Sequence, residues 1–224
     1  MFSENVNNIL RAIISNLQTP VVMILLVLMV ATVIVAGTFV FEFFVEHRKL
    51  KADIPKLIET MNRAKANELT DLIDKNKLLP RQKKALHRLI EADEMDGDTR
   101  ETYASQLLFE EEEHYQKYLR WPQMISKLGP MFGLLGTLVP LGPGLMALGQ
   151  GDTQALSQSL LTAFDTTAAG VVIAAIALVI AQMRKQWYRR YSQALESMME
   201  VILDKWNAGK NSSQDKQEVS DVKK

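Results

Sequence analysis

The chain has 224 residues, and its 26 lysines and arginines equal its 26 aspartates and glutamates in number. This balance excludes an overall bias toward nucleic acid, and the lack of cysteine excludes disulfides and thiolate metal sites. The charges are strongly segregated, however, and leave three long apolar stretches. Because a bilayer span needs about 20 mostly apolar residues, we predict an all-α membrane protein with three transmembrane helices.

The N-terminal part begins with an amphipathic pattern. Apolar side chains recur at helical spacing over residues 2–17, which predicts an amphipathic helix on the outer face of the membrane over residues 1–19. The alternative is a frayed start of the helix that follows. Residues 20–44 are predicted to form the first transmembrane helix. It contains no glycine before Gly37 and is rich in Val, Leu, Ile and Met, which is typical of a helix that faces lipid.

Residues 45–127 are dense in both charge signs and lack the alternation of polar and apolar residues that marks strands. We predict a cytoplasmic helical region, in which the first helix continues inward and three further helices lie near residues 57–75, 80–95 and 99–120. Pro80 suits a first helical position, because the missing N–H would have no partner there.

The second apolar stretch, residues 128–149, is unusually rich in glycine and proline. Gly129, Gly133 and Gly136 form a small-residue face that lets another helix approach closely. Proline at membrane depth, such as Pro140, is tolerated where neighbouring helices or water satisfy the freed carbonyls. We therefore predict that the second transmembrane helix is buried among other helices.

The last part of the chain is predicted to be one long helix with a polar tail. A short outer loop over residues 150–157 leads into the third transmembrane helix, residues 158–183. A cytoplasmic helical extension follows over residues 184–206, with apolar residues on one face for packing. Residues 207–224 lack apolar groups to bury and are predicted to be disordered.

The first half of the third span carries a cluster of polar side chains. It contains Ser159, Thr162, Asp165, Thr166 and Thr167, and Asp165 is the single charge of the span. Most of these residues form two adjacent rows on one side of a helix, and polar groups in a bilayer usually face a bundle interior or a water path. The alternative is that each threonine only donates to a carbonyl of its own helix. The depth of Asp165 stays open, either wetted near the outer boundary or about 10 Å deeper.

Basic residues near the ends of the apolar stretches are strongly one-sided. They gather at residues 48–56, 117–127 and 184–190, whereas Arg11 is the only one on the other side. Because such residues favour the cytoplasmic side, we predict an N-terminus outside and a C-terminus inside the cytoplasmic (inner) membrane.

No motif in the chain predicts an enzyme or a cofactor site. The acidic run of residues 91–98 lacks the first and last carboxylates of a calcium loop. Glu111 and His114 have the spacing of a carboxylate di-metal site, but that site needs a second copy of the motif. We interpret them as part of a charged helix face; a metalloenzyme using Glu111 and His114 is the remote alternative.

Two segments resemble the core of the MotA/TolQ/ExbB proton channel family. That family has a Gly-Leu-Leu-Gly-Thr segment in its penultimate span and a Thr-Ala-x-Gly segment in its last. This chain reads Gly-Leu-Leu-Gly-Thr at residues 133–137 and Thr-Ala-Ala-Gly at residues 167–170. The order of spans also agrees, and one span before the inner region is similar to ExbB and TolQ rather than to MotA.

The resemblance implies a function and partners. Members form a pentameric ring around two copies of a single-span subunit of the ExbD/TolR/MotB type, and the protonatable aspartate lies on that partner. The chain would then be an ion channel and stator subunit, most simply for protons, that converts ion-motive force into mechanical work. A membrane scaffold or signalling protein without ion conduction is the alternative.

The same resemblance assigns site residues, with one departure. Thr137 and Thr167 would line the ion path, and Gly170 joins the glycines and Pro140 as a helix-packing position. ExbB and TolQ carry a glutamate five residues before the last-span threonine, where this chain has Thr162. Asp165 is either a relocated form of that glutamate or a carboxylate at the channel mouth. The expected ion pathway consists of Thr137, Thr167, Thr166, Asp165, Thr162 and Ser159.

Overall fold

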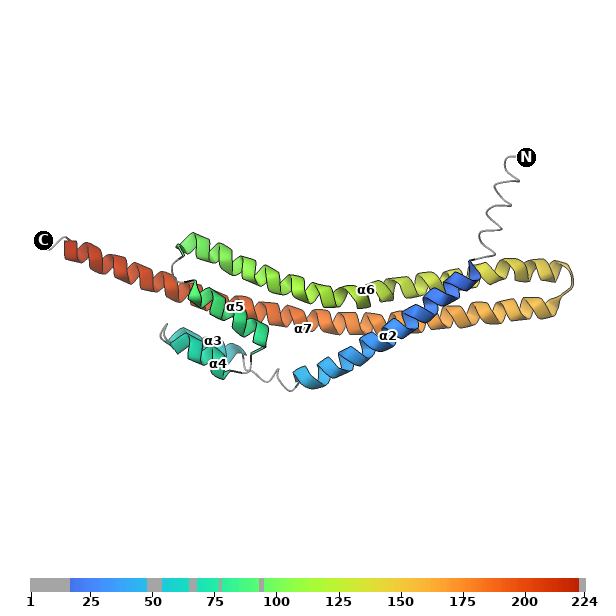
Figure 1. Ribbon diagram of the computed structural model, residues 1–224, viewed down its shortest axis with the longest axis horizontal. Coiled ribbons are helices and arrows are strands. Elements are labelled where there is room, and N and C mark those ends of the chain that lie inside the picture. The colour runs from blue at the N-terminus through green and yellow to red at the C-terminus, as the bar shows by residue number, and fades with distance from the viewer. Residues whose placement is uncertain (1–16, 48–53, 65–67, 77, 93–94, 222–224) are drawn as a thin grey trace, which may run out of the picture. The chain divides into compact units, whose positions relative to one another are not determined.

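In the computed structural model every regular element of the described residues is a helix, which confirms the predicted all-α class (Figure 1). The structure describes residues 17–47, 54–64, 68–76, 78–92 and 95–221. The helices are α2 (Gln18–His47), α3 (Ile54–Arg63), α4 (Leu69–Lys75), α5 (Pro80–Glu91), α6 (Gly97–Gly149) and α7 (Thr153–Asp221). The amphipathic helix predicted for residues 1–19 lies almost entirely outside the described residues.

Three of these helices, α2, α6 and α7, are long and apolar enough to cross a membrane. The 53 residues of α6 and the 69 residues of α7 far exceed a single span, so each continues without a break into a polar extension. The turn between them is shorter than the predicted loop. Asp152 accepts a hydrogen bond of 2.9 Å from the Ala155 N–H and so caps α7, while Gly151 takes the left-handed backbone conformation that the turn requires (φ 82°).

The charged region differs from the sequence prediction in detail. The single helix expected near residues 57–75 is two helices, α3 and α4, whereas α5 begins at Pro80 as predicted. At the other end, α7 continues through residues 207–221, where we predicted disorder. The polar composition of that tail, on which we based the prediction of disorder, argues against a packed apolar core. It is compatible with a helical backbone.

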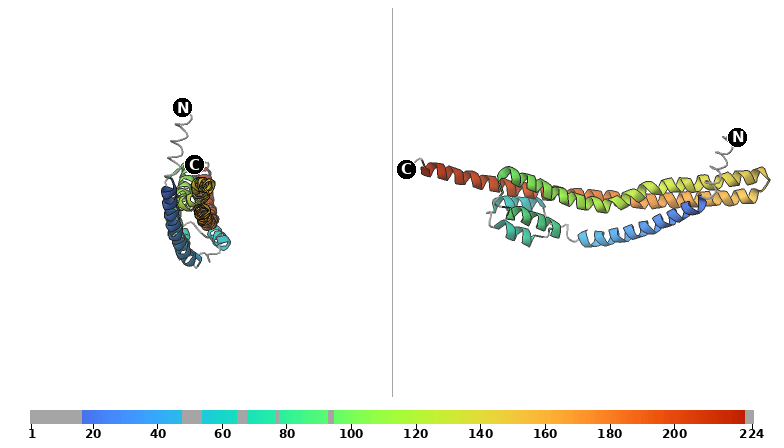
Figure 2. Two further views of the ribbon diagram at one scale, coloured as in Figure 1. Left: turned by 90° about the vertical axis from the view of Figure 1, so that its right-hand side faces the viewer. Right: turned by 45° about the horizontal axis from the view of Figure 1, so that its top comes forward.

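The chain divides into two compact units. We call Met1–Phe41 with Tyr118–Arg184 the span unit, and Glu42–Lys117 with Lys185–Lys224 the charged unit. Within each unit α6 and α7 run side by side (Figure 2). In the span unit α2 packs against both, through a small core of Leu28, Ile125, Ile173 and Ala177 flanked by Ala31, Val35, Leu128 and Phe132.

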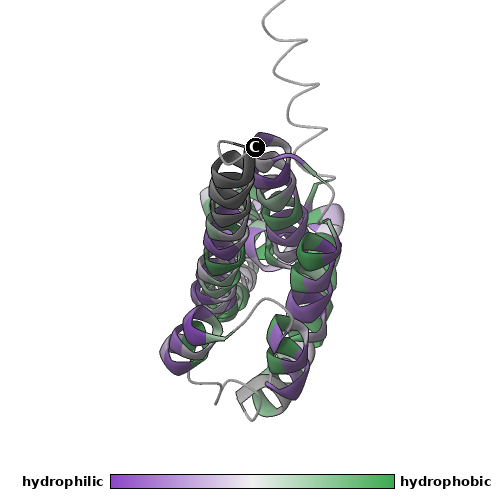
Figure 3. Cartoon of the chain, turned by 90° about the vertical axis from the view of Figure 1, so that its left-hand side faces the viewer, coloured by the Kyte–Doolittle hydropathy of each residue, from purple (hydrophilic) through white to green (hydrophobic). Residues whose placement is uncertain are grey.

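The charged unit has the larger core. Apolar side chains from the short helices α3, α4 and α5 pack against the parts of α6 and α7 that belong to this unit, and hydrophobic and hydrophilic residues alternate along these helices (Figure 3). Its fully buried members include Met61, Ile73, Leu86, Leu89 and Met198. This amphipathic pattern explains why segments of only 7 to 12 residues are helical here.

A cation from a later element caps the C-terminal end of each short helix. Lys83 of α5 donates to Asp74 O at the end of α4 (2.7 Å), and Arg100 of α6 donates to Leu89 O at the end of α5 (3.1 Å). Lys205 of α7 donates to the carbonyl oxygens of Asn62 and Ala64 at the end of α3. Such cations bond to carbonyls that have no partner within the helix, and they interact favourably with the negative end of the helix dipole.

Candidate functional site

The closest contact between α6 and α7 is made by glycines. A Cβ atom added to Gly170 would lie 2.6 Å from Gly129 O and 2.8 Å from the Gly133 Cα. A Cβ added to Gly129 would lie 2.8 Å from Gly170 O. No side chain fits at those distances from backbone atoms, so these glycines set the spacing of the two helices. We call this contact the glycine seam.

The seam continues toward the turn between α6 and α7, where hydroxyl residues occupy the space that glycines leave. A Cβ on Gly136 would lie 2.6 Å from the Thr166 Cβ, and one on Gly144 would lie 2.8 Å from the Ser159 Cβ. Two of the expected pathway residues, Thr166 and Ser159, therefore pack into the seam itself. Pro140 of α6 is buried in the same region.

The threonine hydroxyls donate mainly to carbonyls of their own helices. Thr137 Oγ1 donates to Leu134 O (2.7 Å), Thr162 Oγ1 to Gln158 O (3.0 Å) and Thr166 Oγ1 to Thr162 O (2.9 Å). Thr167 also reaches the other helix: its Oγ1 lies 3.1 Å from Ala163 O and 3.4 Å from Gly133 O. Because each of these hydroxyls donates its proton to a backbone carbonyl, its lone pairs remain to accept a hydrogen bond.

Thr137 and Thr167 lie on the same side of the glycine seam. At about 100° per residue, Thr137 is about 120° from Ile125 on α6, and Thr167 is about 120° from Ile173 on α7 in the same rotational sense. Ile125 and Ile173 pack against α2 through Leu28. For two antiparallel helices, equal offsets place both threonines on the side of the seam that faces away from α2.

Asp165 is separated from this pair of threonines. It is two residues from Thr167, so its side chain points about 160° away around α7. The Asp165 side chain is exposed, whereas Ala163 and Gly170 on the opposite side of the helix are buried against α6. The polar cluster that the sequence places on one side of the third span therefore runs from the seam, at Thr166 and Ser159, round to an exposed face at Asp165.

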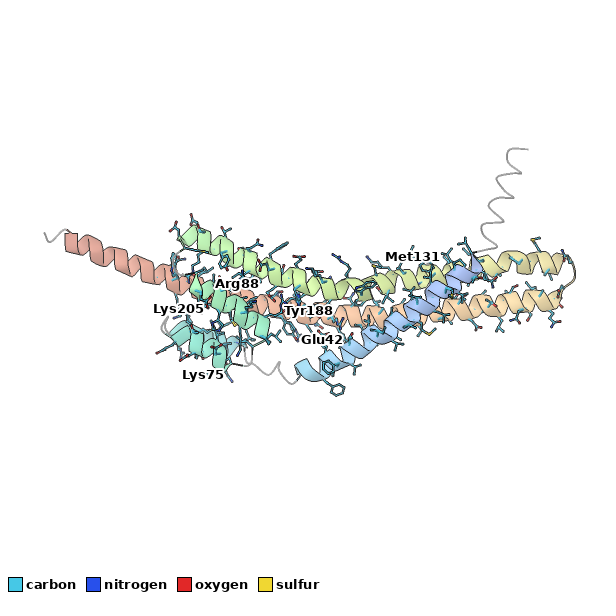
Figure 4. The ribbon with its side chains drawn as sticks, in the orientation of Figure 1. Glu42, Lys75, Arg88, Met131, Tyr188 and Lys205 are labelled. Carbon is cyan, nitrogen blue, oxygen red and sulfur yellow. The ribbon has the colours of Figure 1, made fainter. Side chains whose placement is uncertain are left out.

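A buried aromatic and polar cluster in the charged unit was not foreseen from the sequence. The rings of Tyr115 and Tyr188 stack with centroids 4.6 Å apart, and Tyr188 OH donates to Glu42 Oε1 at 2.8 Å (Figure 4). Gln82 Nε2 donates to Tyr191 O at 3.2 Å. The helical spacing of Tyr188 and Tyr191 was the only signal available, since their partners are far away in sequence.

Glu111 forms an ion pair with Arg81 of α5. Arg81 Nε lies 3.0 Å from Glu111 Oε2, and the carboxylate side chain is only 11% exposed. Burial lowers the pKa of His114 below its ordinary value of 6.5, and the nearby Arg81 charge lowers it further. Within the described ranges, no three His, Asp or Glu side chains come close enough to hold a metal ion.

Comparison with known proteins agrees with the fold and the motifs. The sequence model of the MotA/TolQ/ExbB proton channel family matches residues 74–197, more than half of the chain. The chain therefore belongs to this family, as its two motifs predict. It is 32% identical over 113 residues to the biopolymer transport protein exbB1 of Vibrio cholerae serotype O1. That match covers 49% of this chain and 50% of the relative, so the chain spans about half the length of the curated relative it matches.

Proposed function

We propose that the chain is an ion-conducting stator subunit of the inner membrane, with protons as the ion. Together with two copies of a single-span ExbD/TolR/MotB-like partner, it converts ion-motive force into mechanical work. Its N-terminus lies outside and its C-terminus in the cytoplasm. The observation that carries the proposal is the pair Thr137 and Thr167, whose hydroxyls share one side of a tight glycine seam, away from α2.

The seam suits this task because it fixes two hydroxyls without filling the space beside them. Thr137 and Thr167 each spend their proton on a backbone carbonyl, so each offers lone pairs to water or to a protonated group on the partner. The glycines hold α6 and α7 too close to slip past one another. The two hydroxyls thus keep their places while the partner moves.

A ring of five copies supplies the surroundings of the path. Alone, the chain exposes large apolar side chains on the sides of α6 and α7 that face away from each other, as well as on α2. Lipid covers α2, and neighbouring copies cover the outer sides of α6 and α7. The exposed residues include Met131, Leu138 and Leu145 on α6, and Leu161, Val172 and Val179 on α7.

Ion flux into proteoliposomes that hold the chain and its partner tests the proposal. Thr167→Val and Thr137→Val remove a hydroxyl from the path, and we expect each to lower proton flux about tenfold, the usual effect of losing one hydrogen bond to a charged group. Thr32→Val is the matched control, because Thr32 is buried in α2 and donates only to Leu28 O at 2.7 Å. Its flux should equal that of the unmodified chain.

Asp165→Asn separates the two roles considered for this carboxylate. Because Asp165 points about 160° away from Thr167, we expect flux to fall about twofold or less, as for a charge at the channel mouth. A loss as large as that of Thr167→Val would instead show that Asp165 replaces the family glutamate. An assembled complex with no flux at all would contradict the channel and leave a scaffold.

A further inference from the structure

The charged unit carries a group of acidic residues on α6 and a group of basic residues on α7. Residues 185–195 of α7 hold three cations and no carboxylate, and residues 109–117 of α6 hold four glutamates. Of these glutamates, Glu111 is buried against Arg81 and Glu110 binds Arg88. Glu112 and Glu113 are exposed, as are Arg189 and Arg190.

The stacked pair of Tyr115 and Tyr188 fixes where these charges point. Glu113 is two residues before Tyr115, and Arg190 is two residues after Tyr188, so each points about 160° away from the α6–α7 contact. Because the helices are antiparallel, two residues back along α6 and two residues forward along α7 both lead about 3 Å in the same direction. Glu113 and Arg190 therefore lie at one level, on opposite outer sides of the pair.

Neither charge can reach the other within one chain. Interaxial distances of 8–10 Å and a Cα radius of about 2.3 Å put the Cα atoms of Glu113 and Arg190 about 13 Å apart, with their side chains pointing outward. In the part of the chain that the structure describes, Arg189 and Arg190 make no ion pair. Glu113 makes only a surface pair with Lys117 one turn away, at 3.1 Å, which contributes little and exchanges easily.

We propose that Arg190 pairs with Glu113 of a second copy of this chain. Rotation about an axis parallel to the α6–α7 pair keeps every copy at the same level. A head-to-tail contact then brings the α7 side of one copy against the α6 side of the next, and repeated contacts close a ring. This inference rests on the ring of copies in the proposed function, and it names the residues that set the level of neighbouring copies.

Disulfide cross-linking tests the contact directly, because the chain has no cysteine of its own. In the double variant Glu113→Cys/Arg190→Cys, the two thiols of one chain are too far apart to join, since disulfides need Cα atoms within about 7 Å. Oxidation in native membranes should therefore give a ladder of covalent multimers. Each single-cysteine variant should give no ladder of covalent multimers on oxidation. Glu113→Cys/Asp204→Cys is the control, because Asp204 lies about 21 Å further along α7, and it should give no ladder.

A second pair of variants keeps the test independent of the cysteines. Arg190→Glu should raise the monomer fraction of the detergent-purified protein about two- to fivefold, the range expected for one exposed ion pair. Adding Glu113→Arg should restore the assembly. A double-cysteine variant that folds but yields only monomers on oxidation would overturn the contact, as would a charge reversal that the swap does not restore. Neither readout needs ion flux, so a complex that cross-links but does not conduct would refute the channel and leave this contact standing.

Discussion

The span unit and the charged unit hold α6 against α7 by opposite means. In the span unit the two helices touch through glycines, which have no side chain, so that the backbone of Gly129 meets the backbone of Gly170. In the charged unit large side chains fill the contact, with Tyr115 stacked on Tyr188 and Leu107 and Leu195 buried nearby. The difference teaches that the same pair of helices is sensitive to opposite kinds of substitution in its two parts. Removing atoms should harm the charged unit, and adding atoms should harm the span unit.

Removing atoms from the charged unit gives the largest expected effect. Leu86 is fully buried in the core of this unit. Leu86→Ala should lower the free energy of unfolding by about 2–5 kcal/mol, through lost burial and the cavity left behind. Phe109→Ala deletes a larger side chain, but one that is 59% exposed, so it should cost under about 1 kcal/mol. Denaturant unfolding followed by tryptophan fluorescence compares the two, and equal costs would refute a well-packed core.

Adding a single methyl group to the glycine seam comes next. Gly170→Ala places a Cβ 2.6 Å from Gly129 O, so we expect a destabilisation of about 1–3 kcal/mol and a lower melting temperature in detergent. Gly37→Ala meets no atom within 4 Å and should be neutral or gain up to about 1 kcal/mol of helix stability. If both variants melt alike, the seam is looser than its geometry indicates.

Breaking the partly buried ion pair should have a smaller effect. Arg81→Gln leaves Glu111 nearly buried without its cation, which should cost about 1–2 kcal/mol after allowing for the 48% exposure of Arg81. Arg63→Gln removes an exposed pair with Glu59 and should cost less than about 0.5 kcal/mol. Thermal unfolding ranks the two variants, and a larger loss for Arg63→Gln would reverse the expected order.

The titration of His114 is the most subtle measure of the charged unit. Burial and the Arg81 charge lower the pKa of His114 below 6.5, so the unfolded chain binds a proton more readily than the folded chain. The contribution of this group to stability is therefore complete above about pH 6.5 and is lost as the pH falls below that value. Selective labelling of the three histidines resolves its midpoint by NMR. Arg81→Gln should raise that midpoint; a value of 6.5 or above in the unmodified chain would contradict the effect of burial.

The sequence predicts best what depends on local pattern. The three apolar helices, the α5 start at Pro80 and the glycine spacing at 129, 133 and 136 are all visible as periodicity or composition. The break between α3 and α4 is not, because no glycine or proline marks it and the cation that caps the end of α3 is the distant Lys205. Likewise, the separation of Asp165 from Thr167 depends on which side of α7 meets α6, and only the packed pair of helices decides that.

The cations that cap the short helices also set an order of folding. Each cap comes from a residue later in the chain: Lys83 serves α4, Arg100 serves α5 and Lys205 serves α3. The core that covers α3 likewise contains Leu195, Met198 and Ile202 of α7. During synthesis α3 must therefore wait, without its cap and without the α7 part of its apolar cover, while both later spans are made. The charged unit closes only after residue 205 has been made, and a chain that stops before α7 cannot complete it.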